Sequence, residues 1–163
     1  MKTQDMILLY EYNYWATKRI LAASAKVSQE QLTAPTAHSY GSLRGTLLHT
    51  LEAEYAWRMR CQHNTSIPDM VEAEFPSLDV LERRWREEET AMRDYVAGLK
   101  DDDLTGRVRY TTDSGIKRDR VLWHCLLHVV NHGTQHRSEA AAILTGYGYS
   151  PGDVDFTVFL NEK

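Results

Sequence analysis

The chain has 163 residues, of which 42% are hydrophobic and 26% charged, and its formal net charge is −4. This length suits one domain with a substantial core, so we expect residues 1–163 to fold as a single unit. The sequence has neither a strongly basic block nor an apolar run of about 20 residues, which argues against binding of nucleic acid and against a membrane span.

The beginning of the chain and its cysteines suggest where the protein works. The segment MKTQDMILLYEYNYWATKRI carries acidic residues inside its apolar stretch and has no cleavage site of small residues, so it does not resemble a signal peptide. Cys61 and Cys125 are far apart in the sequence and form no Cys-x-x-Cys pair. We therefore expect a cytoplasmic protein with reduced thiols.

Hydrophobic residues at helical spacing predict an all-α fold with four long helices. We expect these helices to cover about 3–25, 41–62, 77–99 and 119–145. The turn-forming segment HNTSIPDMVEAEFPS separates the second helix from the third. This connection is long for a helix–helix loop, so it suits a crossover between helices two and three in a four-helix bundle.

The third helix has a clear start and two distinct sides. Ser77 is a suitable N-cap residue. The run RRWREEE at 83–89 is expected to form the solvated side, including all of its acidic residues. The apolar side follows a helical stripe made of Leu78, Leu81, Trp85, Met92, Tyr95, Val96 and Leu99.

Two smaller elements flank the fourth helix. Within 107–120, Thr and Val residues surround an Asp-Ser-Gly turn, which predicts a short β-hairpin before the helix. Gly146 is expected to end the helix. Asp153 is expected to cap a short C-terminal helix over 154–160.

Three histidines stand four residues apart in the fourth helix, at positions 128, 132 and 136. Because an α-helix turns about 100° per residue, His136 lies about 40° around the helix from His132 and about 6 Å along its axis. Two imidazoles at this spacing can converge on one metal ion. The sequence between them, His-Gly-Thr-Gln-His, lacks the glutamate of the His-Glu-x-x-His zinc proteases, which argues against a protease of that type.

His49 in the second helix is our choice for a third ligand, because a catalytic zinc usually takes three protein ligands and a water. Glu54 and Arg58 point away from it on the helical wheel. Ala53 and Ala56 share its side, and such small residues leave room for a cavity. The alternative for each histidine is a hydrogen-bonded core residue, which is the commoner role of a buried imidazole.

The second helix is not cleanly amphipathic. Leu47 and Leu51 lie near its charged side, so we expect it to be buried on two sides, for instance at a subunit interface. The tryptophans of the chain are most simply core residues, with Trp15 or Trp57 as an alternative lining for a pocket.

The remaining histidines and cysteines are weaker candidates. His128 continues the stripe but drifts around the helix, so we expect it to support the ligands or the fold rather than to bind metal. His124 is expected near the helix start, and His38 and His63 in exposed loops. Cys125 lies about 10 Å along the helix from His132, too far for shared ligation, and Cys61 has no evident partner.

Several segments resemble a known family. SLRGTLLHTLEAEYAWRMR in the second helix and HVVNHGTQHRSE in the fourth are similar to the two signature segments of the DinB-like (DinB/YfiT) proteins. The start YEYNYWATKRIL and the tail GYSPGDVDFTVFL are similar to family segments in the same order, so the resemblance covers nearly the whole chain. The run of His128, Asn131, His132, His136 and Arg137 is its most specific part.

This resemblance implies a four-helix bundle with a long crossover that holds a divalent metal ion, commonly zinc or nickel. The ligands carried over to this sequence are His49, His132 and His136, in a cleft with one open coordination position. The resemblance also implies a homodimer. The sequence departs from the family at Gln135, where another histidine is common, and at Thr17, where asparagine is frequent.

The resemblance implies a function only by analogy of fold. Relatives in the wider superfamily lead us to expect transfer of a low-molecular-weight thiol to a small electrophile. A metal-assisted hydrolase and a non-catalytic protein that binds metal or a stress ligand are the alternatives. No catalytic residue is assigned, although Glu52 or Asp155 could serve as a base.

Overall fold

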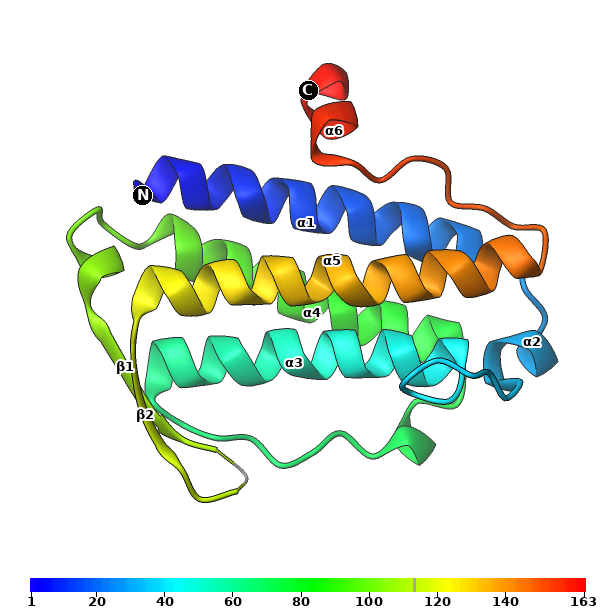
Figure 1. The fold of residues 1–163 in the computed structure, drawn as a ribbon, viewed down its shortest axis with the longest axis horizontal. Helices are drawn as coiled ribbons and strands as arrows, with labels where there is room; N and C mark the ends of the chain where they lie inside the picture. Colours follow the sequence, from blue (N-terminus) through cyan, green and yellow to red (C-terminus); the bar gives the residue numbers. More distant parts are fainter. Residues whose placement is uncertain (113) are drawn as a thin grey trace.

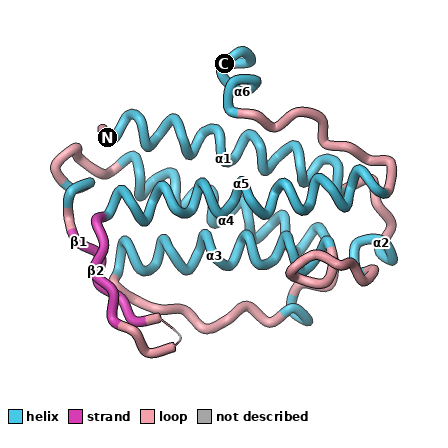
Figure 2. The backbone as a smooth tube through the Cα atoms, viewed as in Figure 1, coloured by secondary structure: helices cyan, strands magenta, loops and turns pink. Residues whose placement is uncertain are grey.

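The computed structural model describes residues 1–112 and 114–163. Its elements are α1 (Thr3–Ser24), α2 (Gln29–Thr33), α3 (Leu43–His63), η1 (Glu72–Glu74), α4 (Leu78–Ala97), η2 (Asp103–Thr105), β1 (Arg107–Thr111), β2 (Lys117–Val121), α5 (Leu122–Gly146) and α6 (Phe156–Glu162). The fold is mostly helical with one small two-stranded sheet, and Figure 2 shows the strands confined to one end of the long helices.

The four long helices α1, α3, α4 and α5 correspond to the four predicted ones. Each packs on two of the others: α5 contacts α1 and α3, and α4 contacts the same two. Figure 1 shows α3 and α5 side by side along the length of the molecule. It also shows α3 and α4 running in the same direction, which explains why a long segment must cross between them, as predicted.

Two groups of buried apolar side chains fill the space between the long helices. One group joins α1 and α5 near the hairpin and includes Tyr10, Tyr14 and Leu126, all at most 1% exposed. The other lies toward the opposite end and includes Leu51 and Leu81, both fully buried. The mixed pattern of α3 has a physical reason within the chain, because α2, α4, α5 and β1 all pack on this helix.

The predicted hairpin is confirmed, and it changes where α5 begins. β1 and β2 pair antiparallel, with Val108 opposite Arg120. Val108 is 3% exposed, so its side of the hairpin faces the helices. The backbone N–H of Leu122 donates to Gly106 O. Residues 119–121 are therefore strand rather than helix; Asp113 of the expected turn lies outside the described residues.

The ends of the helices were predicted correctly only in part. Gly146 is the last residue of α5, as expected. Ser77 occupies the N-cap position of α4, but its side chain makes no capping hydrogen bond. The prediction for Asp153 was wrong: Asp155 is the N-cap residue of α6. Helix α2 was not predicted, although Ser28 and Gln31 form a capping box at its start.

The acidic run of α4 was wrongly assigned to solvent as a whole. Glu88 is fully buried, and Arg58 of α3 donates to both of its carboxylate oxygens, at 2.6 and 2.8 Å. Glu88 lies three residues after Trp85 and four before Met92, so it continues the apolar stripe of the helix. The helices of the described chain include none with the length and hydropathy of a membrane span.

Candidate metal centre

Helices α3 and α5 bring together the three histidines that the sequence singled out. His132 Nε2 lies 3.1 Å from His49 Nε2 and 3.2 Å from His136 Nε2. The coordinating atoms of all three residues lie within 4.8 Å of one another, so this group could hold a metal ion. The spacing of four residues in α5 supplies two imidazoles from one helical face, and the packing of α3 on α5 supplies the third.

The distances between these nitrogens suit a tetrahedral ion. Zinc–nitrogen bonds of about 2.0–2.1 Å at tetrahedral angles separate neighbouring nitrogens by about 3.3 Å. The two separations at His132 agree with that value within a few tenths of an ångström. The group contains three donors from described residues, whereas a structural zinc site is usually closed by four protein ligands.

The protonation of the group also suits a cation. Burial, together with the neighbouring imidazoles, lowers the pKa of His49 and of His132 from 6.5 to about 4. Both rings are therefore neutral near pH 7, and a neutral imidazole has the nitrogen lone pair that a metal requires. His136 is 4% exposed, so one side of the group is closed to water.

Glu139 orients His136 from the side opposite the other two imidazoles. One of its carboxylate oxygens lies 3.0 Å from His136 Nδ1, one turn along α5. A carboxylate accepts a hydrogen bond only from a protonated Nδ1, so this contact leaves the lone pair on Nε2. Glu139 was not predicted as part of the site, although it follows His136 by three residues on the same helical face.

Tyr40, in the loop before α3, covers the group from outside. Its ring stacks on His49 with centroids 3.7 Å apart and meets the edge of His136 at 5.2 Å. Tyr40 remains 38% exposed, so it shields the imidazoles without sealing them. Its partial burial, aided by Glu139, raises the pKa of its phenol. No helical periodicity extends to this loop, so no pattern in the sequence indicated this contact.

A buried polar network holds α5 against α1 and α3 behind the histidines. Arg137 is 3% exposed and donates to Asn13 Oδ1, and Asn13 donates to Glu54 Oε2 at 3.1 Å. Tyr14 donates to the other oxygen of Glu54. Burial is the main cause that raises the pKa of Glu54 from 4.5 to about 7. Glu54 was expected to point away from His49, and it does so, but into the core rather than into solvent.

The other candidates lie outside the group of three. His128 is exposed, and its ring centroid lies 5.6 Å from that of His132. His124 lies in the first turn of α5, as predicted. His63 is exposed but belongs to the last turn of α3 rather than to a loop, and His38 is half-buried rather than exposed.

The two residues considered as general bases have structural roles in the described chain. Glu52 accepts a hydrogen bond from Met70 N at 2.6 Å and so fixes the crossover segment to α3. Asp155 is the N-cap residue of α6. Neither belongs to the group of three histidines.

Cys61 does have a neighbour, contrary to expectation. It packs against the group of buried side chains that contains Cys125. The neighbouring Cys125 thiol and burial raise the pKa of the Cys61 thiol. Both cysteines are free thiols. Cys125 is not among the donors of the three-histidine group, as the helical spacing predicted.

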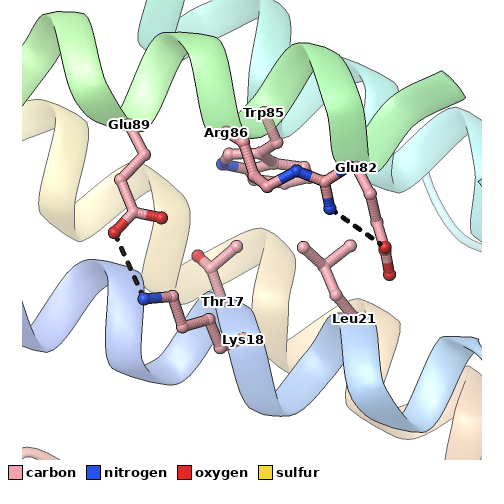
Figure 3. Close-up of a pocket in the computed structure, with 7 residues that line it drawn as sticks. All are labelled: Thr17, Lys18, Leu21, Glu82, Trp85, Arg86 and Glu89. Atoms are coloured by element: carbon pink, nitrogen blue, oxygen red, sulfur yellow. Dashed lines mark ion pairs between the residues drawn. The ribbon is translucent and has the colours of Figure 1, made fainter. Parts of the chain in front are cut away.

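Two pockets differ in their relation to the histidines. A pocket of about 210 Å³ between α1 and α4 is drawn in Figure 3; there Lys18 pairs with Glu89 and Arg86 pairs with Glu82. None of the three histidines lines it. A second pocket, of about 300 Å³, lies between α3, α5 and the hairpin and includes His128 in its wall. The second pocket is therefore the one adjacent to the candidate centre.

Comparison with known sequences agrees with this geometry. The model of the DinB family matches residues 1–163. The chain belongs to the DinB family. Protein DinB of Bacillus subtilis (strain 168) is 26% identical to it over 162 residues, covering 93% of this chain and 91% of the relative. In this member of the DinB family, the segments that carried the resemblance are the parts of α3 and α5 that bring the three histidines together.

Proposed function

We propose that this DinB-family protein binds a divalent metal ion, zinc or nickel, through His49, His132 and His136 and transfers a low-molecular-weight thiol to a small electrophile. The observation that carries the proposal is the convergence of three imidazoles, two from α5 and one from α3, as a group of three rather than four among the described residues. A closed set of four would favour a purely structural ion. The helix contacts support a four-helix bundle as the scaffold.

The chemistry follows from the charge of the donors. Three neutral imidazoles leave the full positive charge of a bound ion uncompensated, and such an ion lowers the pKa of a thiol or water at an open position. Glu139 holds His136 in one tautomer, and Tyr40 keeps part of the bulk solvent away from His49. In the transfer, a carbon–sulfur bond forms and one other bond of that carbon breaks. With a chlorinated acceptor, the carbon–chlorine bond breaks, chloride departs with the electron pair, and the thiol proton passes to the buffer. With an epoxide, the carbon–oxygen bond breaks, and the oxygen keeps the electron pair and takes up a proton.

Elemental analysis tests the metal site. We expect about one divalent ion per chain in the purified protein and little in the variant His132→Ala/His136→Ala. The matched control is His63→Ala/His124→Ala, which removes two exposed histidines outside the group. Equal metal content in all three proteins would disprove the site.

An assay of thiol transfer distinguishes an enzyme from a binding protein that uses the metal ion only for stability. The metal-loaded protein should accelerate the reaction of a small thiol with a chlorinated aromatic acceptor or an epoxide. His49→Ala should abolish this acceleration while circular dichroism still shows a folded helical protein. If His49→Ala instead lowers the unfolding temperature sharply and no thiol reacts, the ion is structural and the transfer is wrong.

A further inference from the structure

We propose that the pocket beside the histidines binds the carboxylate-bearing tail of the thiol, so that the ligand extends along α5 from the histidines toward the hairpin. This inference rests on the proposed function for the identity of the group at the histidines. The pocket has a volume of about 300 Å³. Its lining residues are Trp57, Tyr110, Arg120, His124, Cys125 and His128.

The pocket and the candidate centre are neighbours, and His128 is the lining residue that lies next to the centre. The ring centroid of His128 lies 5.6 Å from that of His132 and 5.0 Å from that of Trp57. The pocket therefore begins one helical turn away from the nearest candidate ligand. From His132 to the start of α5 at Leu122 the helix rises about 15 Å. A thiol of tripeptide size, about 10 Å long when extended, can span most of this distance.

The walls of the pocket carry positive charge and no acidic side chain. Arg120 lies opposite Val108 in the hairpin, on the side that faces the helices. The acid next to it, Asp119, faces the other way and pairs with Arg107 and Arg109. No Asp or Glu is among the described residues that line the pocket. Arg120 therefore offers a charge to an anionic ligand rather than to a neighbouring carboxylate.

A second guanidinium stands behind the aromatic walls. The central guanidinium carbon of Arg60 lies 5.3 Å from the Trp57 ring and 5.7 Å from the Tyr110 ring. Arg60 Nε is buried and makes no hydrogen bond to any described residue. Trp57 and Tyr110 themselves meet edge to face at 5.2 Å. They offer an apolar surface to the aliphatic part of a ligand, with cationic groups close by.

The N-terminal end of α5 adds to the positive charge around the pocket. Its first turn contributes His124 and Cys125 to the pocket wall, and no side chain caps this helix end. The N-terminal end of a helix carries partial positive charge, which favours a carboxylate over a neutral group. Arg120, Arg60 and this helix end together select an anionic tail and disfavour a cationic one.

Isothermal titration calorimetry with three probes tests the proposal on the metal-loaded protein. Glutathione carries a thiol and two carboxylates, its diethyl ester keeps the thiol but masks the carboxylates, and S-methylglutathione keeps the carboxylates but blocks the thiol. The difference in affinity between glutathione and the diester measures whether the pocket binds the carboxylates. The difference in affinity between glutathione and S-methylglutathione measures whether the thiol binds at the histidines.

We expect glutathione to bind about tenfold more tightly than its diester, the size of effect that one charge-assisted hydrogen bond supplies. Arg120→Glu should remove this preference. Lys117→Glu makes the same change of charge on the same strand, on the side that faces away from the helices, and should retain the preference.

The outcomes separate the two proposals. Equal affinity for glutathione and its diester, or equal behaviour of the Arg120 and Lys117 variants, overturns the anionic pocket even if the thiol matters. Binding of S-methylglutathione that equals that of glutathione and depends on Arg120 supports the pocket but overturns thiol binding at the histidines. Absence of binding by all three probes overturns both.

Discussion

Glu139 contacts the three-histidine group through His136 Nδ1, which lies 3.0 Å from one of its carboxylate oxygens. Glu139→Ala removes the acceptor that fixes the tautomer of His136, so we expect metal affinity to fall by about 10- to 100-fold without unfolding. Competition with a chromogenic chelator measures this change. Ser138→Ala, an exposed neighbour on the same helix, should leave the affinity unchanged; equal losses in both variants would remove the role of Glu139.

Glu54 gives the protein a pH-dependent term in its stability. Its pKa rises from 4.5 to about 7 on folding, so the folded state binds more protons than the unfolded state between these values. The stabilising contribution of Glu54 to the free energy of unfolding is fully present below pH 4.5. This contribution, on the order of 3 kcal/mol, is lost as the pH rises to about 7.

Urea unfolding of the metal-free protein and of Glu54→Gln, from pH 4.5 to 7.5, isolates this term. His49 and His132 titrate in the opposite sense, because their lowered pKa values make the folded state lose stability as the pH falls toward 4. Both proteins contain these histidines, so their effect cancels in the difference. We expect the stability of the wild type relative to Glu54→Gln to decrease with rising pH, and a constant difference would contradict the shifted pKa of Glu54.

Side chains on a regular helical face were the ones that sequence could identify. His132 and His136 follow from helical geometry, and the choice of His49 needed only one face of a second helix. Tyr40 reaches the group from a loop, whose path depends on tertiary contacts. The burial of Glu54 was not predicted, because the hydrogen bonds from Asn13 and Tyr14 that make it tolerable come from another helix.

At the scale of the elements, Gly133 determines how closely α1 approaches α5. A Cβ atom at this position would lie 2.7 Å from Arg137 Nη1 and 2.9 Å from Asn13 Oδ1, inside van der Waals contact. We expect Gly133→Ala to destabilise the protein by about 1–3 kcal/mol, because the buried network must shift to make room.

Chemical denaturation checks this prediction against a control in the same helix. Gly146, the last residue of α5, has no atom within 4 Å of an added Cβ. Gly146→Ala should therefore be neutral or slightly stabilising. If Gly133→Ala proves as stable as Gly146→Ala, the close approach of Asn13 and Arg137 to this position costs no stability and the prediction is wrong.

The long helices were predictable because hydrophobic spacing repeats over many turns. The start of α5 was not, since residues 119–121 have their backbone paired with 107–109 in the hairpin. The N-cap of α6 was misplaced because the stretch after Pro151 offers Asp153 and Asp155 as equally suitable cap residues. The short helix α2 has a capping box but too few residues for a periodic signal.

For the molecule as a whole, the Arg58–Glu88 pair is the buried ionic link between α3 and α4. Its side chains are 11% and 0% exposed. In Arg58→Ala, the nearest remaining cation to Glu88 would be Arg84 at 3.8 Å, which is beyond hydrogen-bond distance. We therefore expect the free energy of unfolding to fall by about 3–5 kcal/mol. The double variant Arg58→Met/Glu88→Leu should regain most of this free energy, because no charge remains buried.

A surface pair provides the comparison for this measurement. Arg86 and Glu82, shown in Figure 3, lie 3.6 Å apart with 68% and 27% of their side chains exposed. In a urea titration of both variants, Arg86→Ala should lower the free energy of unfolding by less than about 1 kcal/mol. A loss in Arg58→Ala as small as that in Arg86→Ala would show that water reaches Glu88 in solution.

The donor set of the candidate centre is assembled from distant parts of the chain, since His49 and His132 are 83 positions apart. A nascent polypeptide that has emerged from the ribosome only as far as α3 presents one of the three candidate donors, His49, which is a weak ligand by itself. Binding of the proposed ion would therefore have to follow synthesis of α5 and the docking of that helix, at a stage when the chain is nearly finished.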